Sequence, residues 1–98
     1  MHRVFASAVR GGAAALVVPR GTRTVFCNVR FAILPSGGTI TTEWRSGAVR
    51  SDRTVRPRAF RVSAFVRGPS GRALAPGRYT CTLRVRGTPL AAASIRVR

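Results

Sequence analysis

Few side chains in this sequence could perform chemistry on a bound molecule. The groups able to hold a metal ion or to exchange a proton are one histidine, His2, two cysteines, Cys27 and Cys81, and two carboxylates, Glu43 and Asp52. The carboxylates lie on different segments and the histidine lies near the start, so these groups do not make a site with a useful number of ligands. The sequence therefore predicts no metal ion and no cofactor.

Nucleophilic catalysis is not indicated either. A serine nucleophile needs a general base within hydrogen-bond reach and a third group that orients this base. His2 would have to fold back onto the rest of the domain to serve as that base, and no serine lies in a nucleophile motif. The glycine-rich residues 35–38 lack the strand-loop-helix context of a phosphate-binding loop and are predicted to form a turn. We expect no catalytic residue and no enzyme activity.

The charge of the chain is its most unusual property. All eighteen basic residues are arginine and only two residues are acidic, which gives 98 residues a net charge of +16. Almost no internal ion pairs can form, and self-repulsion opposes folding to a compact state. An anionic partner such as nucleic acid or a polysaccharide is therefore indicated. The choice of arginine over lysine also fits a GC-rich coding sequence.

Alternating apolar and polar residues predict the strands that position the cysteines. Side chains two residues apart on a strand share one face of the sheet, so an inward Cys27 fixes the facing of its whole segment and turns Asn28 outward. The same pattern exposes Glu43. The predicted inward side chains are Val25, Cys27, Val29 and Phe31 in residues 23–32, Ile40, Thr42 and Trp44 in residues 39–45, Phe60, Val62, Ala64 and Val66 in residues 60–67, Tyr79, Cys81, Leu83 and Val85 in residues 78–86, and Ile95 and Val97 beyond them.

The arrangement of Cys27, Trp44, Tyr79 and Cys81 resembles that of an immunoglobulin-like domain. The resemblance implies an all-β, antiparallel β-sandwich of about seven strands, with one disulfide between the sheets, the tryptophan packed on it and the tyrosine hydroxyl bonded to the preceding corner. Such a bridge would close a loop of about 55 residues and add about 4 kcal/mol to the free energy of unfolding. It would also favour an oxidising location: extracellular, at the cell surface or on a virion.

Residues 14–98 are predicted to form this domain, and residues 1–13 an N-terminal arm. The arm contains basic and isolated apolar residues and ends in a pair of glycines. It is interpreted as an assembly arm or as a degenerate secretory signal, since Arg10 and the glycines interrupt the apolar stretch that a signal requires. No run of residues approaches the roughly 20 apolar residues of a membrane span.

Two outward surfaces are candidate binding sites. The resemblance implies that the strands of Trp44, Cys81 and Ile95 share a sheet, whose outer face would then be rich in arginine and contain one acid, Glu43. This face is interpreted either as a solvated surface with counterions or as a polyanion-binding site. The predicted polyanion-binding residues are Arg45, Arg84, Arg86, Arg96 and Arg98.

On the opposite sheet, two outward phenylalanines are expected on neighbouring strands. Aromatic side chains ringed by arginine are typical of the centre and rim of a protein interface. Coverage by the N-terminal arm or by the loop after Arg45, and stacking on unpaired bases, are the alternatives. The predicted protein-interface residues are Phe26, Phe65, Arg30, Arg61 and Arg67, with Val4 and Phe5 of the arm.

The leading functional prediction is a non-enzymatic structural or interaction module. It would be a subunit of an extracellular or particle-surface assembly, such as a virion decoration protein or a surface filament, that self-assembles or contacts a neighbouring structural protein. The alternative is a protein that binds nucleic acid or another polyanion through the arginine-rich face. An accessory domain of a larger secreted protein is a third interpretation.

Overall fold

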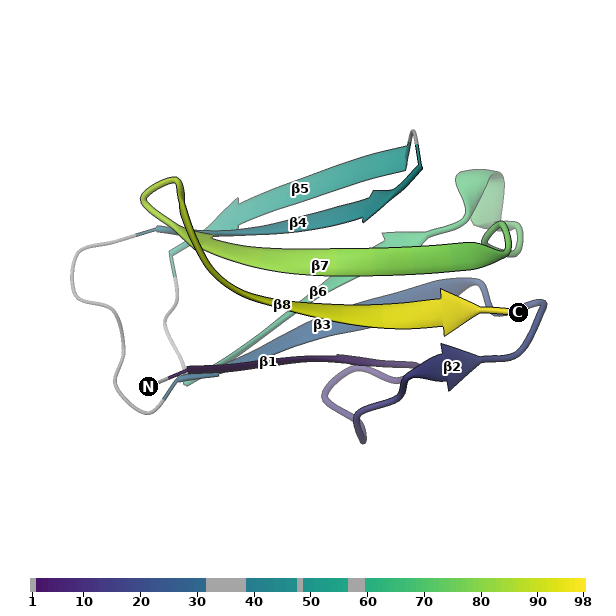
Figure 1. Ribbon diagram of the computed structural model, residues 1–98, viewed down its shortest axis with the longest axis horizontal. Helices are drawn as coiled ribbons and strands as arrows, with labels where there is room; N and C mark the ends of the chain where they lie inside the picture. The colour runs from purple at the N-terminus through teal and green to yellow at the C-terminus, as the bar shows by residue number, and fades with distance from the viewer. Residues whose placement is uncertain (1, 32–38, 48, 57–59) are drawn as a thin grey trace.

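The computed structural model describes residues 2–31, 39–47, 49–56 and 60–98. In these residues the chain forms eight β-strands and one 3-10 turn, η1 (Pro69–Gly71), and no α-helix. The strands make two sheets that lie one above the other (Figure 1). The predicted all-β sandwich is therefore confirmed. Its assignment to the immunoglobulin-like family stays a prediction, and the described residues contain eight strands where about seven were expected.

The smaller sheet has three antiparallel strands in the order β1 (His2–Ser7), β3 (Thr24–Phe31) and β6 (Arg61–Arg67). The register places Arg30 of β3 between Arg3 and Arg61. Four residue pairs further along, Phe26 lies directly opposite Phe65. Each of these sets of residues therefore shares one face of the sheet.

The larger sheet has five strands in the order β2 (Val17–Val18), β8 (Thr88–Val97), β7 (Gly77–Val85), β4 (Ile40–Ser46) and β5 (Val49–Val55). Only β2 and β8 pair in parallel. As expected, Trp44, Cys81 and Ile95 lie on strands of one sheet. The strand β5 pairs with β4 along its length and forms one edge of this sheet.

A disulfide between Cys27 and Cys81 joins the two sheets, as predicted. Trp44 lies opposite Cys81 on the neighbouring strand, is 1% exposed and belongs to the same core cluster as both cysteines. The Tyr79 hydroxyl donates a hydrogen bond of 2.8 Å to the carbonyl oxygen of Ala75, four residues upstream. These three contacts confirm the roles that the resemblance implied for the four marker residues.

Alternation predicted most inward positions correctly, since β3, β4, β7 and β8 bury the expected side chains, except that Val85 of β7 is only partly buried. The exception among the aromatic residues is Phe60. It was predicted to be inward, but it precedes the first residue of β6 and is 55% exposed. The turn predicted at residues 35–38 lies outside the described residues. Within the part of the chain that is described, no helix is long and apolar enough to cross a membrane.

The predicted N-terminal arm is part of the sandwich. Residues His2–Ser7 form β1 and pair with β3 over their whole length. The sequence interpretation missed that Val4 and Ala6 alternate with Arg3 and Phe5, because a small alanine carries little hydrophobic signal. Ala6 is 3% exposed and Val4 packs against the core, so these residues complete the inner face of the smaller sheet. Cleavage as a signal would remove this strand.

Candidate interaction faces

Both acidic residues of the chain lie on the outer face of the five-stranded sheet. Glu43 of β4 is directly opposite Asp52 of β5. The Glu43 side chain is only 7% exposed, and its carboxylate oxygens lie 3.0 Å from Arg45 Nε and 3.1 Å from Arg50 Nη2. Arg84 Nη2 is 3.9 Å away. The prediction that Glu43 is exposed was wrong, because these arginine side chains cover it.

Arg50 links the two carboxylates. Its Nη2 lies 3.0 Å from Asp52 Oδ2, and its Nε donates a hydrogen bond of 3.3 Å to Asp52 Oδ1. This hydrogen bond, followed by the charges of Asp52 and Glu43, raises the pKa of the Arg50 guanidinium above its ordinary value. Neither Arg50 nor Asp52 was a predicted site residue, since only the pairing of β5 with β4 brings them onto this face.

This acidic pair predicts a modest loss of stability for Glu43→Gln. The substitution removes the charge shared by the arginines, but these side chains can be resolvated because they are partly exposed. We expect the free energy of unfolding to fall by about 1–2 kcal/mol at low salt and by less at high salt. Urea unfolding at two ionic strengths measures this loss. Asp52→Asn, at a side chain that is 40% exposed, is the control with the smaller expected effect. Equal losses for the two variants would contradict a larger stabilising role for Glu43.

The predicted polyanion-binding residues do not form one continuous surface. Arg45 and Arg84 lie beside the carboxylate of Glu43, which they share with Arg50. Arg86 lies in the hairpin turn between β7 and β8, where its φ of 52° is in the left-handed region. The remaining two, Arg96 and Arg98, lie toward the end of β8, where Arg96 is opposite Arg78 and Val17.

The outer face of the three-stranded sheet concentrates positive charge more strongly. Arg3, Arg30 and Arg61 are directly opposite one another on β1, β3 and β6, and all three are exposed. We call them the arginine row. Like charges that face each other across strands are destabilising. No carboxylate lies on this face to offset them, because the only two acids in the sequence, Glu43 and Asp52, lie on the other sheet.

Two phenylalanine rings lie on the same face of the sheet, four residues along their strands from the arginine row. The rings of Phe26 and Phe65 have centroids 6.4 Å apart and meet edge to face at 65°. A guanidinium lies over each ring, 5.3 Å away for Arg10 on Phe26 and 4.5 Å away for Arg67 on Phe65. Such cation–π contacts are favourable. The arginine–phenylalanine face comprises Arg3, Arg10, Arg30, Arg61, Arg67, Phe5, Phe26 and Phe65.

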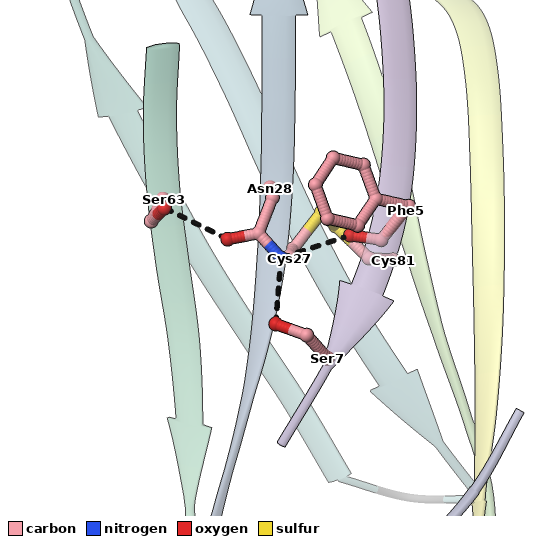
Figure 2. Close-up of a disulfide and its surroundings, with 6 residues drawn as sticks. All are labelled: Phe5, Ser7, Cys27, Asn28, Ser63 and Cys81. Atoms are coloured by element: carbon pink, nitrogen blue, oxygen red, sulfur yellow. Dashed lines mark hydrogen bonds between the residues drawn. A yellow bond between two sulfur atoms is a disulfide. The ribbon is translucent and has the colours of Figure 1, made fainter. Parts of the chain in front are cut away.

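A buried asparagine holds this face together. Asn28 is 3% exposed, and its Nδ2 donates hydrogen bonds to the Phe5 carbonyl (3.3 Å) and to Ser7 Oγ (2.8 Å). Its Oδ1 accepts hydrogen bonds from Ser63 Oγ (2.8 Å) and from the Gly11 amide (2.9 Å). Figure 2 shows the side chain between β1 and β6. Asn28 was predicted only to face outward; its burial follows from the turn after β1, which folds back over it.

The structure places the predicted interface residues in three different environments. Phe26 and Phe65 are neighbours as predicted, and both are half-buried. Val4 points into the sandwich, and Phe5 is 8% exposed with the guanidinium groups of Arg3 and Arg30 each 5.3 Å from its ring centroid. Neither Val4 nor Phe5 can therefore serve as an exposed anchor. Arg30, Arg61 and Arg67 are exposed on this face, where they can reach a partner.

The described residues hold few side chains that could bind a metal ion or act as a general base. They contain no group of three or more histidine, cysteine, aspartate or glutamate side chains that could hold a metal ion. A hollow of about 590 Å³ beside β2 and β8 is lined by Val17, Pro76, Gly77, Arg96, Val97 and Arg98, and none of these side chains is a general base at neutral pH.

Comparisons with known proteins do not define a family for this chain. No family model and no curated protein matches it. Among solved structures, it is similar to the Pseudomonas fluorescens alkylpurine DNA glycosylase AlkC bound to DNA containing an abasic site analogue, at 16% sequence identity and a TM-score of 0.48. The match covers 97% of this chain but only 30% of the glycosylase chain. A likeness this weak carries no argument about function.

Proposed function

We propose that this protein is a non-enzymatic structural or interaction module, a subunit of an extracellular or particle-surface assembly, and that it contacts a negatively charged partner through the arginine–phenylalanine face. The observation that carries the proposal is the arginine row. Three exposed arginines stand abreast on adjacent strands with no carboxylate on their face. An anionic partner would relieve this repulsion.

The partner of this face differs in composition from the chain itself. Two copies that met through it would bring two arginine rows together, and a net charge of +16 on each would oppose their approach. Self-assembly therefore requires another surface, for which the edge strands β5 and β6 are candidates. The face itself suits the anionic surface of a different molecule.

The disulfide supports the location included in the proposal. Bridges of this kind persist outside the cytosol, in secreted proteins and on cell or virion surfaces. Both cysteines are 0% exposed, so this bridge is a structural link in the core and not an accessible redox centre. An extracellular, cell-surface or virion location agrees with such a bridge.

Binding of nucleic acid or another polyanion is the second candidate function. It is favoured by the separation of the two acids from the arginine row, which leaves one sheet face purely cationic. The surface differs from the one that the sequence indicated, since the binding charges would come from Arg3, Arg30 and Arg61. The two candidates are compatible, because a subunit that coats an anionic surface binds a polyanion.

The arginine row predicts how strongly the chain is retained on an anionic matrix. The variant Arg3→Gln, Arg30→Gln, Arg61→Gln should elute from a heparin column at clearly lower salt than the parent, because each arginine lost is one contact fewer with the sulfates. The matched variant Arg53→Gln, Arg96→Gln, Arg98→Gln removes the same charge from β5, from β8 and from the residue after β8. If both variants elute at the same salt, the binding surface is not the arginine row and the proposal is wrong.

A further inference from the structure

We propose that the anionic partner of the arginine–phenylalanine face is a single-stranded nucleic acid, whose phosphates lie along the arginine row and whose unpaired bases stack at Phe26 and Phe65. This inference rests on the proposed function and specifies its partner. It is argued from the spacing of the charges, from the kind of cation, from the aromatic rings and from the rigidity of the face.

The spacing of the arginine row suits a chain of phosphates. Neighbouring strands in a sheet lie about 4.8 Å apart, so the row presents one cation at each such step across β1, β3 and β6. Nucleotides in a fully stacked strand advance about 3.4 Å each, and an unstacked strand is longer. Successive phosphates can therefore meet successive arginine side chains, which have several rotatable bonds to adjust their reach.

The kind of cation also suits phosphate. A guanidinium presents a planar pair of N–H donors that can bind two phosphate oxygens at once. Among the described residues, none of the three arginines makes an ion pair, and the guanidinium groups of Arg3 and Arg30 lie over the ring of Phe5. The donors of the row are thus available to a ligand.

The aromatic rings distinguish a nucleic acid from an acidic protein or polysaccharide. Phe26 and Phe65 lie four residues from the arginine row along their strands, about 13 Å away. Unpaired bases stack on aromatic rings and on guanidinium planes. The face offers a ring and a guanidinium together at two places, Phe26 with Arg10 and Phe65 with Arg67. A duplex keeps its base faces stacked internally, so it can use the arginines but not the rings.

The face is held rigid between its charged and aromatic parts. Asn28 lies between Arg30 and Phe26 on β3, and its hydrogen bonds connect β3 to Ser7 of β1 and to Ser63 of β6. The backbone positions of the two parts therefore keep a fixed separation, so that a ligand contacting both has only side chains to order. Stacking at Phe26 and Phe65 would tolerate any nucleotide sequence, because it does not depend on the edges of the bases.

Fluorescence anisotropy with a labelled oligothymidylate of about fifteen nucleotides tests this inference. A plot of log affinity against log salt should lose about 2 units of slope in the Arg3→Gln, Arg30→Gln, Arg61→Gln variant, since each phosphate contact to a single strand contributes about 0.7. The Phe26→Leu and Phe65→Leu variants should each weaken binding by about 5- to 100-fold and leave the slope unchanged. Leucine preserves apolar bulk, and thermal unfolding verifies that both variants fold.

Inorganic polyphosphate, which has no bases, separates the proposed binding of an anion by the arginine row from the proposed stacking of bases at Phe26 and Phe65. Its binding should depend on the arginine row and be unaffected by either leucine substitution. If both leucine variants bind oligothymidylate as tightly as the parent, or if a duplex of equal length binds as tightly as the single strand, the stacking inference is wrong while the arginine-dependent function stands. If Arg53→Gln, Arg96→Gln, Arg98→Gln weakens both probes as much as the row variant, the proposed function fails as well.

Discussion

Removal of the bridge by Cys27→Ala with Cys81→Ala is expected to lower the free energy of unfolding by about 4 kcal/mol. The cysteines are 54 residues apart in sequence, so the bridge removes a large part of the conformational freedom of the unfolded chain. Both side chains are also fully buried beside Trp44, and their loss leaves space in the core. For a domain of this size such a loss is a large part of the total stability.

Urea unfolding followed by the fluorescence of the single tryptophan measures this effect. The high positive charge adds a second expectation. Salt should raise the free energy of unfolding of the bridge-free variant more than that of the parent, because screening weakens the self-repulsion that the bridge opposed. Parent protein unfolded with and without a reductant is the control with an unchanged sequence. A loss below about 1 kcal/mol in both comparisons would show that the bridge contributes little.

The second large effect is expected at Asn28. Asn28→Ala removes four hydrogen bonds at once and leaves buried partners, among them Ser7 at 0% exposure, without their donor or acceptor. Each unsatisfied buried group costs about 1–3 kcal/mol, and water can reach some of the partners, so we expect a total loss of about 3 kcal/mol. The loss should be greatest in β1, which is an edge strand held by Asn28 at Phe5 and Ser7.

Amide hydrogen exchange tests where this loss occurs. The amides of β1 should become much less protected in Asn28→Ala, whereas those of β7, in the centre of the other sheet, should change only with global stability. Ser63→Ala removes a single partner and should cost about 1 kcal/mol. Equal loss of protection in β1 and β7, beyond what global unfolding explains, would contradict a local role for Asn28.

The inner faces of the sandwich were predictable because alternation is a local property. Once Cys27 was placed inward, the facing of Val25, Val29 and Phe31 followed from a period of two, and the structure confirms all of them. The same pattern did not predict the strand β1, because this strand is short and its inward residues include alanine. Its position depends on pairing with β3, which no local pattern encodes.

The outer faces were less predictable, because their properties depend on neighbours from distant segments. Glu43 and Asn28 both occupy outward positions, yet both are buried, in part by Arg50 and by the turn at Gly11, which the sequence alone did not place beside them. Alternation turned Arg30 and Arg61 outward, but only the register of β1 adds Arg3 and completes the row. An asparagine between Cys27 and Val29 in the middle of a strand, where asparagine is disfavoured, was the available signal for the hydrogen-bonded centre.

The placement of Glu43 and Asp52 on one sheet makes the molecule electrically asymmetric. Negative charge is confined to the outer face of β4 and β5, while the arginine row projects from the other side of the sandwich. Near an anionic surface, the local repulsion of these two carboxylates disfavours approach by the outer face of β4 and β5 and biases the orientation of the encounter toward the arginine row. The encounter would then begin in a productive orientation, and at higher ionic strength association would slow because the rotational steering is screened.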